Sequence, residues 1–193
     1  MRLDYIPDPP VFSSADDQAV LERVKQRRGE KGLIALDRAL LHAPPVADGW
    51  NSFLGAIRTN TSLSTAVRET AICRVAVLNT AWYEWEAHSP ILKSASDITE
   101  DHIAAVLKSP PHEVNDGIQT PALAAVLKYT DAMTTTVTVP DGVFVELKKY
   151  FNEREVVEIT ATIGAYNCVS RFLVALDVGE RNGQEGPKEG GKE

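Results

Sequence analysis

Residues 68–90 read RETAICRVAVLNTAWYEWEAHSP, and no other part of the chain gathers as many reactive and aromatic side chains. The first half is an apolar helical pattern interrupted by the carboxylate of Glu69. The second half places two tryptophans, a tyrosine, two carboxylates and a histidine within seven residues. Residues four apart lie above one another on a helix, so Glu84 and His88 are predicted to share one face.

The helix predicted over residues 65–80 is apolar nearly all round, which is typical of a helix buried in a core. An unpaired charge at Glu69 would be costly there, so this carboxyl is expected to have a partner or a raised pKa. Two interpretations stay open at this point. Glu69 is a catalytic carboxyl, or it forms a structural ion pair with Arg68 or Arg74 that holds helices in register.

Four residues are predicted to be catalytic, because their side chains transfer protons or stabilise charge near neutral pH. His88 is the candidate general acid or base. Glu84, one turn earlier, orients the imidazole or donates a proton itself. Tyr83 supplies a hydroxyl to a developing oxyanion, and Glu69 completes the set.

A second group of side chains is predicted to bind substrate. Aromatic walls suit a planar substrate, and polar positions on a buried helix can meet a ligand. The predicted substrate-binding residues are Trp50, Phe53, Trp82, Trp85, Asn167 and Arg171. For Trp50 and Phe53 a place in the core is an open alternative, since an apolar stripe at helical spacing is the ordinary signal of a core.

The residues Arg68-Glu69, Asn79, Tyr83-Glu84-Trp85 and His88, in this order, resemble the centre of the carboxymuconolactone decarboxylase family, which also contains the AhpD-type alkylhydroperoxidases. The resemblance covers roughly residues 40–178. It implies an all-α fold, the AhpD-like or carboxymuconolactone decarboxylase-like helical bundle. It also implies a homo-oligomer, a trimer or hexamer, that works without a cofactor.

The chain departs from the peroxidase branch of that family at two positions. In that branch a Cys-x-x-Cys motif begins twelve residues after the glutamate and ends four residues before the histidine. Here Ala81 and Glu84 occupy the two cysteine positions, so that no dithiol is left to reduce a peroxide. The resemblance therefore implies the decarboxylase-like, non-redox branch.

Composition narrows the possible partners and location. The net charge of −7 and the pI of about 5.2 argue against nucleic-acid binding, which requires clustered Lys and Arg. No apolar run approaches the length of a membrane span, and early acids and prolines argue against a signal peptide. Cys73 and Cys168 both lie in apolar helical patterns and are expected to be packed thiols in a reducing compartment. We expect a cytoplasmic protein with a small-molecule substrate, no nucleic acid and no membrane partner.

The organisation along the chain is predicted as one domain between two irregular ends. Residues 1–13 form an extended N-terminal arm, 14–178 a single helical domain, and 179–193 a disordered tail that is too polar and glycine-rich to fold. Helix caps are predicted at Ser64, Thr99 and Asn152. His102 is expected to face solvent. The predicted helices cover 14–28, 33–41, 46–58, 65–80, 82–95, 97–108, 120–135, 142–151 and 153–176.

These patterns favour a cofactor-free lyase or isomerase that acts on a small carboxylated lactone or cyclic carbonyl compound. Three alternatives stay open. The first is a non-catalytic helical assembly in which the Glu and His side chains are buried structural pairs. The second is a divalent metal site formed by Glu69, Glu84 and His88. The third, residual redox chemistry, is disfavoured by the missing Cys-x-x-Cys motif.

Overall fold

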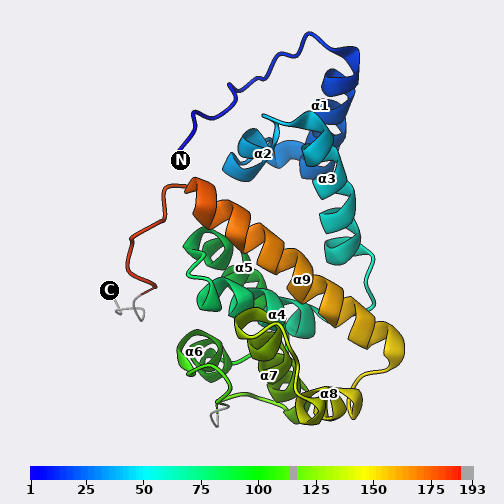
Figure 1. The fold of residues 1–193 in the computed structure, drawn as a ribbon, viewed down its shortest axis with the longest axis vertical. Coiled ribbons are helices and arrows are strands. Elements are labelled where there is room, and N and C mark those ends of the chain that lie inside the picture. The colour runs from blue at the N-terminus through cyan, green and yellow to red at the C-terminus, as the bar shows by residue number, and fades with distance from the viewer. Residues whose placement is uncertain (114–116, 188–193) are drawn as a thin grey trace. The chain divides into compact units, whose positions relative to one another are not determined.

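The computed structural model describes residues 1–113 and 117–187, and every regular element within those ranges is helical (Figure 1). The all-α class predicted from the sequence is therefore confirmed. In chain order the elements are α1 Ala15–Arg28, the 3-10 helix η1 Gly29–Lys31, α2 Ala35–Leu40, α3 Pro44–Thr59, α4 Thr65–Leu78, α5 Trp82–Lys93, α6 Glu100–Lys108, α7 Pro121–Thr135, α8 Asp141–Lys148 and α9 Glu153–Leu176.

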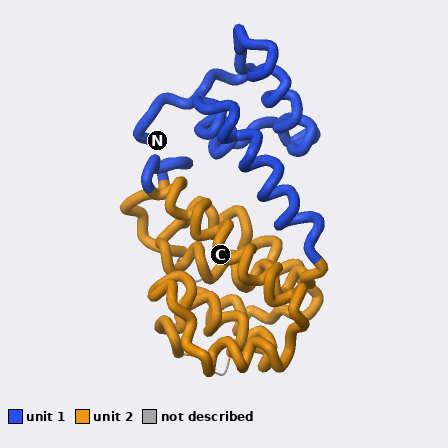
Figure 2. Tube along the Cα trace, turned by 45° about the vertical axis from the view of Figure 1, so that its right-hand side comes forward, with its two compact units in different colours: residues 1–61, 175–180 blue, residues 62–174, 181–193 orange. Residues whose placement is uncertain are grey.

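The chain divides into two compact units (Figure 2). The first contains residues 1–61 and 175–180, and the second contains residues 62–174 with the described part of 181–193. The single domain predicted over 14–178 stays a prediction. The part of the predicted disordered tail at 188–193 lies outside the described residues.

The first unit consists of α1, α2 and α3 with the N-terminal arm. The Arg2 backbone N–H donates to the Leu176 carbonyl at 2.8 Å, and the Gly179 N–H donates to the Tyr5 hydroxyl at 2.8 Å. Helix α3 begins two residues earlier than predicted, because Pro44 and Pro45 occupy its first turn. Proline is tolerated there, since the N–H groups of a first turn have no partner within the helix.

Side-chain caps set the starts of several helices in the second unit. Ser64 accepts a hydrogen bond from the Val67 N–H at 3.2 Å, and Thr99 accepts one from the His102 N–H at 3.2 Å. A capping box precedes α9, where Asn152 accepts from the Glu155 N–H at 3.1 Å and the Glu155 carboxylate accepts from the Asn152 N–H at 2.9 Å. All three predicted caps are confirmed.

Helix α4 is the central element of the second unit and packs against α5, α6 and α7. Ten of its residues are buried, among them the charged Glu69 and Arg74. The Arg74 guanidinium makes a bidentate ion pair with Asp131 of α7, in which the Nη2–Oδ2 distance is 3.1 Å. Its Nη1 atom donates to the carbonyls of Val106 and Ser109 at 2.9 and 3.0 Å. One arginine thereby links α4 to α7 and to the end of α6.

A second buried polar link joins α4 to α6. His102 is fully buried, which makes the expectation that it faces solvent wrong. Its Nδ1 atom accepts from the Gln119 N–H at 3.5 Å, so Nε2 carries the proton and donates to the Thr70 hydroxyl at 3.0 Å. Two charged residues ahead of His102 suggested a solvated turn, but the amphipathic face of α6 points this residue inward.

Helix α9 contacts the other helices of the second unit through polar side chains. The Tyr129 and Thr160 hydroxyls lie 2.9 Å apart, which links α7 to α9. By length and composition alone α9 could cross a membrane, and 44% of its most apolar window is buried within the protein. The absence of a membrane partner stays a prediction.

Breaking the Arg74–Asp131 pair should strongly destabilise the fold. Asp131→Asn leaves the buried guanidinium without a countercharge, and we expect a loss of about 3–5 kcal/mol in the free energy of unfolding. Urea denaturation measures this loss. The matched control Asp97→Asn, at an exposed position, should change it by less than about 0.5 kcal/mol. A loss below about 1 kcal/mol for Asp131→Asn would contradict the assigned role.

His102 should make the fold sensitive to mild acid. Burial lowers its pKa to about 4, whereas the unfolded chain takes up this proton near pH 6.5. The contribution of His102 to the free energy of unfolding is thus fully present above pH 6.5, and it falls by about 3 kcal/mol as the pH approaches 4. His102→Gln should lack this component. Denaturation curves at several pH values would test it, and an equal acid dependence in both proteins would rule it out.

Candidate functional site

The second unit brings Glu69 and His88 into direct contact. Glu69 lies in α4 and His88 in the second turn of α5, and only 1% and 5% of the two residues are exposed. The His88 Nδ1 atom lies 2.7 Å from Glu69 Oε2. A carboxylate on one nitrogen of an imidazole fixes the ring orientation and strengthens the ring as a proton acceptor.

The charge state of Glu69 follows from its partners. Burial alone would raise its pKa, but the hydrogen bond and charge of His88, together with Arg68, outweigh burial and lower the pKa below the usual range. Arg68 Nε lies 3.2 Å from Glu69 Oε1. Of the two structural partners considered for Glu69, Arg68 is the one observed, while Arg74 pairs with Asp131. Glu69 is therefore a carboxylate at neutral pH.

Glu84 is in the opposite state, although it lies one turn before His88 in the same helix. Its Oε1 atom accepts a hydrogen bond from the Ser170 hydroxyl at 3.0 Å, and its Oε2 atom is buried without a hydrogen-bond partner among the described residues. Burial raises the pKa of Glu84 well above the usual range, against the lowering effect of Ser170. Burial therefore favours the protonated, neutral form of Glu84 over the carboxylate.

The Cys73 thiol lies in the electrostatic field of both carboxyls. Burial raises its pKa well above the usual range, and the charge of Glu69 raises it further. A thiol in this state is a poor nucleophile, since the thiolate is the reactive form. Cys168 is exposed on α9. The prediction that both thiols are packed is thus confirmed for Cys73 and wrong for Cys168, whose helical pattern did not reveal which face it occupies.

Tyr166 of α9 also contacts the histidine. Its ring meets the His88 ring edge-on, with centroids 5.0 Å apart and an interplanar angle of 84°. Only 2% of Tyr166 is exposed. Neither Tyr166 nor Ser170 was among the predicted site residues, although Asn167 and Arg171 of the same helix were, because helical spacing alone does not show which positions of α9 reach the central motif. For Tyr166, the sequence signal that could have indicated a site residue was its polar hydroxyl within a long apolar helix.

The aromatic residues around His88 have different environments. Trp85 is 5% exposed and belongs to a core cluster with Cys73, Leu92 and Leu127. Trp82 is half-buried and packs against that cluster. Its ring lies so close to Gly186 that a Cβ atom there would approach it to 2.9 Å. Tyr83 is half-buried in the first turn of α5.

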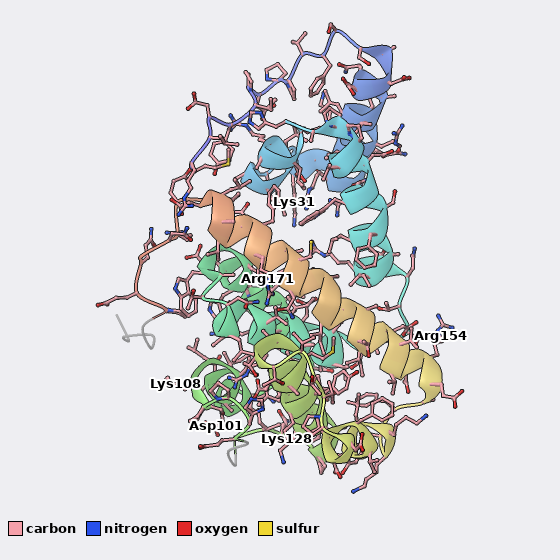
Figure 3. All side chains as sticks on the ribbon, in the orientation of Figure 1. Lys31, Asp101, Lys108, Lys128, Arg154 and Arg171 are labelled. Carbon is pink, nitrogen blue, oxygen red and sulfur yellow. The ribbon has the colours of Figure 1, made fainter. Side chains whose placement is uncertain are left out.

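The other predicted binding residues lie apart from the Glu69–His88 contact or in the other unit. Asn167 of α9 donates to the Thr134 hydroxyl at 3.0 Å and accepts from Asn79 at 3.2 Å. Arg171 is exposed on α9 and donates to the Asn167 carbonyl at 3.1 Å (Figure 3). Trp50 and Phe53 lie on α3 in the first unit, half-buried and 49% exposed respectively.

The metal alternative finds no geometric support in the described part of the chain. Across residues 1–113 and 117–187, no group of three or more His, Cys, Asp or Glu side chains is placed to hold a metal ion. Glu69 and His88 contact each other, while the hydrogen bond of Glu84 goes to Ser170. The arrangement instead offers an oriented imidazole and a neutral carboxylic acid, a combination suited to proton transfer.

The helices that carry this arrangement match a known family. Residues 44–110 match the model of the Carboxymuconolactone decarboxylase family. The match covers about a third of the chain. The matched segment contains α3 to α6, and with them Glu69, Glu84 and His88. No curated protein matches the chain.

Solved structures share the fold of this chain. A protein of unknown function from Agrobacterium tumefaciens, described as an antioxidant defence protein AhpD, is 22% identical, with a TM-score of 0.59, over 77% of this chain and 94% of its own. An uncharacterized peroxidase-related protein from Silicibacter sp. TM1040 is 17% identical, with a TM-score of 0.66, over 95% and 92%. The debrominase Bmp8, in complex with 2,3,4-tribromopyrrole, is 19% identical, with a TM-score of 0.65, over 91% and 92%. These similarities confirm the predicted AhpD-like fold.

The buried proton on Glu84 should leave a signature in the pH dependence of stability. The folded chain keeps this proton at pH values where the unfolded chain, with a pKa of about 4.3, has released it, so folding takes up a proton and stability falls as pH rises. Glu84→Gln cannot ionise. Above pH 4.3 the free energy of unfolding of this variant should rise relative to that of the wild type by up to about 1.4 kcal/mol per pH unit.

Urea unfolding at acidic, neutral and mildly basic pH measures this gain. The matched control is Glu86→Gln, at an exposed position in the same helix. Its free energy of unfolding should change with pH as that of the wild type does. If the stability of Glu84→Gln instead shows the same pH dependence as that of the wild type across this range, Glu84 is ionised in the folded chain and the raised pKa assigned to it is wrong.

Proposed function

We propose that this protein is a cofactor-free carboxy-lyase or isomerase that acts on a small carboxylated lactone or cyclic carbonyl compound by acid–base catalysis. The observation that carries the proposal is the buried contact between Glu69 of α4 and His88 of α5, with Oε2 and Nδ1 2.7 Å apart. Helix α5 also holds the buried acid Glu84. Two carboxyls with opposite pKa shifts beside one imidazole divide naturally into an orienting base and a proton donor.

The roles follow from these states. Glu69 holds the imidazole of His88 in one orientation and stabilises its protonated form. His88 then acts as general acid or base toward the substrate, and Glu84 supplies a second proton. Tyr83 is proposed as the hydroxyl donor to the developing oxyanion. Trp82 and Trp85 are proposed as aromatic walls of the substrate site.

In decarboxylation, the bond between the substrate carbon and its carboxylate breaks, and carbon dioxide leaves. The electron pair of that bond moves onto the neighbouring carbonyl as an enolate. His88 or Glu84 then donates a proton to the carbon, and the enzyme regains its proton from water. Isomerisation uses the same groups, with removal of a proton from one carbon and its return to another. General acid–base catalysis of this kind contributes roughly 100- to 10,000-fold in rate.

Peroxide reduction and reductive dehalogenation are less well supported for this chain, although a peroxidase-related protein and a debrominase share its fold. Ala81 and Glu84 fill the cysteine positions of the peroxidase-type motif, and Cys73 is buried with a raised pKa. The non-redox branch is therefore part of the proposal. The trimeric or hexameric assembly and the cytoplasmic location remain predictions.

The non-catalytic alternative, in which the Glu69–His88 contact only holds α4 to α5, makes a different prediction for His88→Gln. Under the proposed function this variant should lose at least about 100-fold in turnover, because it can neither accept nor deliver the proton. Turnover is followed as carbon dioxide release and by product analysis, over a panel of carboxylated lactones and phenolic acids. The matched control is His42→Gln, at an exposed histidine of the first unit.

Thermal unfolding of both variants separates chemistry from folding. Loss of turnover at an unchanged melting temperature supports catalysis by His88. If no compound in the panel is converted by the wild type, or if His88→Gln converts it equally well, the proposed function is wrong and the contact is structural.

A further inference from the structure

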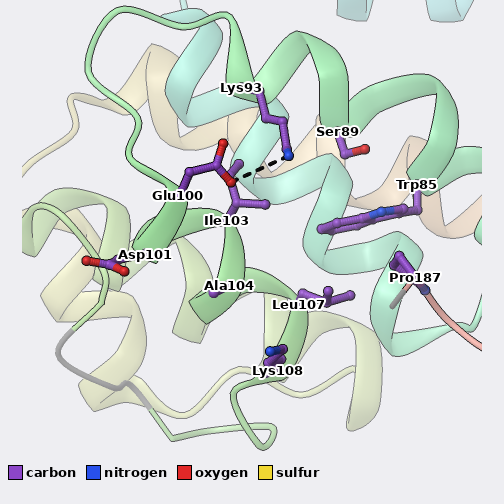
Figure 4. A pocket seen from close by; sticks show the side chains of 10 residues that line it. All are labelled: Trp85, Ser89, Lys93, Glu100, Asp101, Ile103, Ala104, Leu107, Lys108 and Pro187. Carbon is purple, nitrogen blue, oxygen red and sulfur yellow. Dashed lines mark hydrogen bonds and ion pairs between the residues drawn. The ribbon is translucent and has the colours of Figure 1, made fainter. Parts of the chain in front are cut away.

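A hollow of about 340 Å³ lies between α5 and α6, and it does not belong to the Glu69–His88 contact (Figure 4). We call it the α5–α6 groove. Among its lining residues are Trp85, Ser89, Lys93, Ile103, Leu107 and Pro187. Its volume is at the small end of the range for small-molecule sites, which begins at roughly 300 Å³.

The α5–α6 groove uses a different face of α5 from the proposed catalytic residues. Trp85, Ser89 and Lys93 are spaced four residues apart, so they form one ridge along α5. Glu84 and His88 each precede a member of this ridge by one residue, which turns them about 100° away around the helix. The same helix thus presents one face to the buried pair and another to the groove.

The ridge changes its chemistry along its length. It begins with the indole of Trp85, continues with the hydroxyl of Ser89 and ends with the ammonium of Lys93, about 12 Å further along the helix. Leu107 and Pro187 line the groove near the Trp85 end (Figure 4). The Trp85 end is therefore apolar and aromatic, and the other end carries the Lys93 ammonium paired with the Glu100 carboxylate. Asp101 and Lys108 also line the groove.

The Lys93 ammonium can exchange its ion-pair partner with little loss of stability. Lys93 Nζ lies 3.5 Å from Glu100 Oε2, and the two side chains are 49% and 82% exposed. Exposed ion pairs of this kind contribute little to stability, so a ligand carboxylate can replace Glu100 beside Lys93. Asp101 also lines the groove, and in Figure 4 its carboxylate is directed away from Lys93.

We propose that the α5–α6 groove binds a planar aromatic carboxylate, with its ring against Trp85 and Leu107 and its carboxylate on the Lys93 ammonium in place of Glu100. The indole and leucine surfaces match an aromatic ring. The lysine at the far end selects an anion over a neutral compound. The groove shares Trp85 with the proposed substrate site, but it uses none of the proton-transferring residues Glu69, Glu84 and His88.

Isothermal titration calorimetry with naphthoate as the probe tests the proposal. Lys93→Gln should weaken binding about fivefold, which corresponds to the upper end for one exposed ion pair. Glu100→Gln should strengthen binding, because it removes the competing carboxylate. The matched control Lys128→Gln, on α7, removes the same charge outside the groove and should leave binding unchanged (Figure 3). Naphthylmethanol, which lacks the charge, should bind more weakly than naphthoate.

Two further variants complete the test. Ala104→Phe places a ring in the groove and should abolish binding, whereas His88→Gln should bind naphthoate as the wild type does. Equal affinity for naphthoate and naphthylmethanol, or equal effects of the two lysine variants, would overturn the proposal. Absence of binding up to the solubility limit would overturn it too. If Ala104→Phe instead changes the mass measured by light scattering while naphthoate does not bind, the groove is a contact between copies of this chain.

Discussion

The burial of two opposite charges on one helix is the constraint on which the second unit depends. Helix α4 is almost entirely buried, and yet it carries Glu69 and Arg74. Neither charge is tolerated there alone, because each loses its hydration. Arg74 is satisfied by Asp131 of α7 and by carbonyls at the end of α6, and Glu69 is satisfied by His88 of α5. The polar groups of α4 thereby determine which helices surround it.

The same constraint produces the unusual chemistry beside His88. Glu69 pairs with His88 and Arg68, which lower its pKa, whereas among the described residues Glu84 has only the Ser170 hydroxyl, and burial raises its pKa. The difference comes from partners rather than from depth, because both side chains are almost completely buried. At the position that the peroxidase branch gives to a cysteine, this chain therefore carries a buried carboxyl, which takes part in proton transfer under the proposed function.

Helix α5 presents two kinds of surface on two of its faces. The face with Glu84 and His88 points to α4 and α9, where buried polar contacts dominate. The face with Trp85, Ser89 and Lys93 points to α6 and the groove. Trp85 belongs to both the core cluster and the groove wall, so one aromatic residue supports packing and also offers a ligand surface. An aromatic residue in such a motif is therefore not simply core or simply site.

The AhpD-like fold was expected from the family resemblance of the central motif. Local pattern was enough to predict the helices and the caps at Ser64, Thr99 and Asn152, because hydrophobic periodicity and capping act over a few neighbouring residues. It also placed Glu84 and His88 on one face of α5. The partners of buried charges required the tertiary structure. Asp131 lies 57 residues from Arg74, and Tyr166 and Ser170 reach the motif from α9. His102 faces inward for the same reason. Contacts between helices decide which polar side chains are buried away from water, and the spacing of residues within one helix does not reveal these contacts.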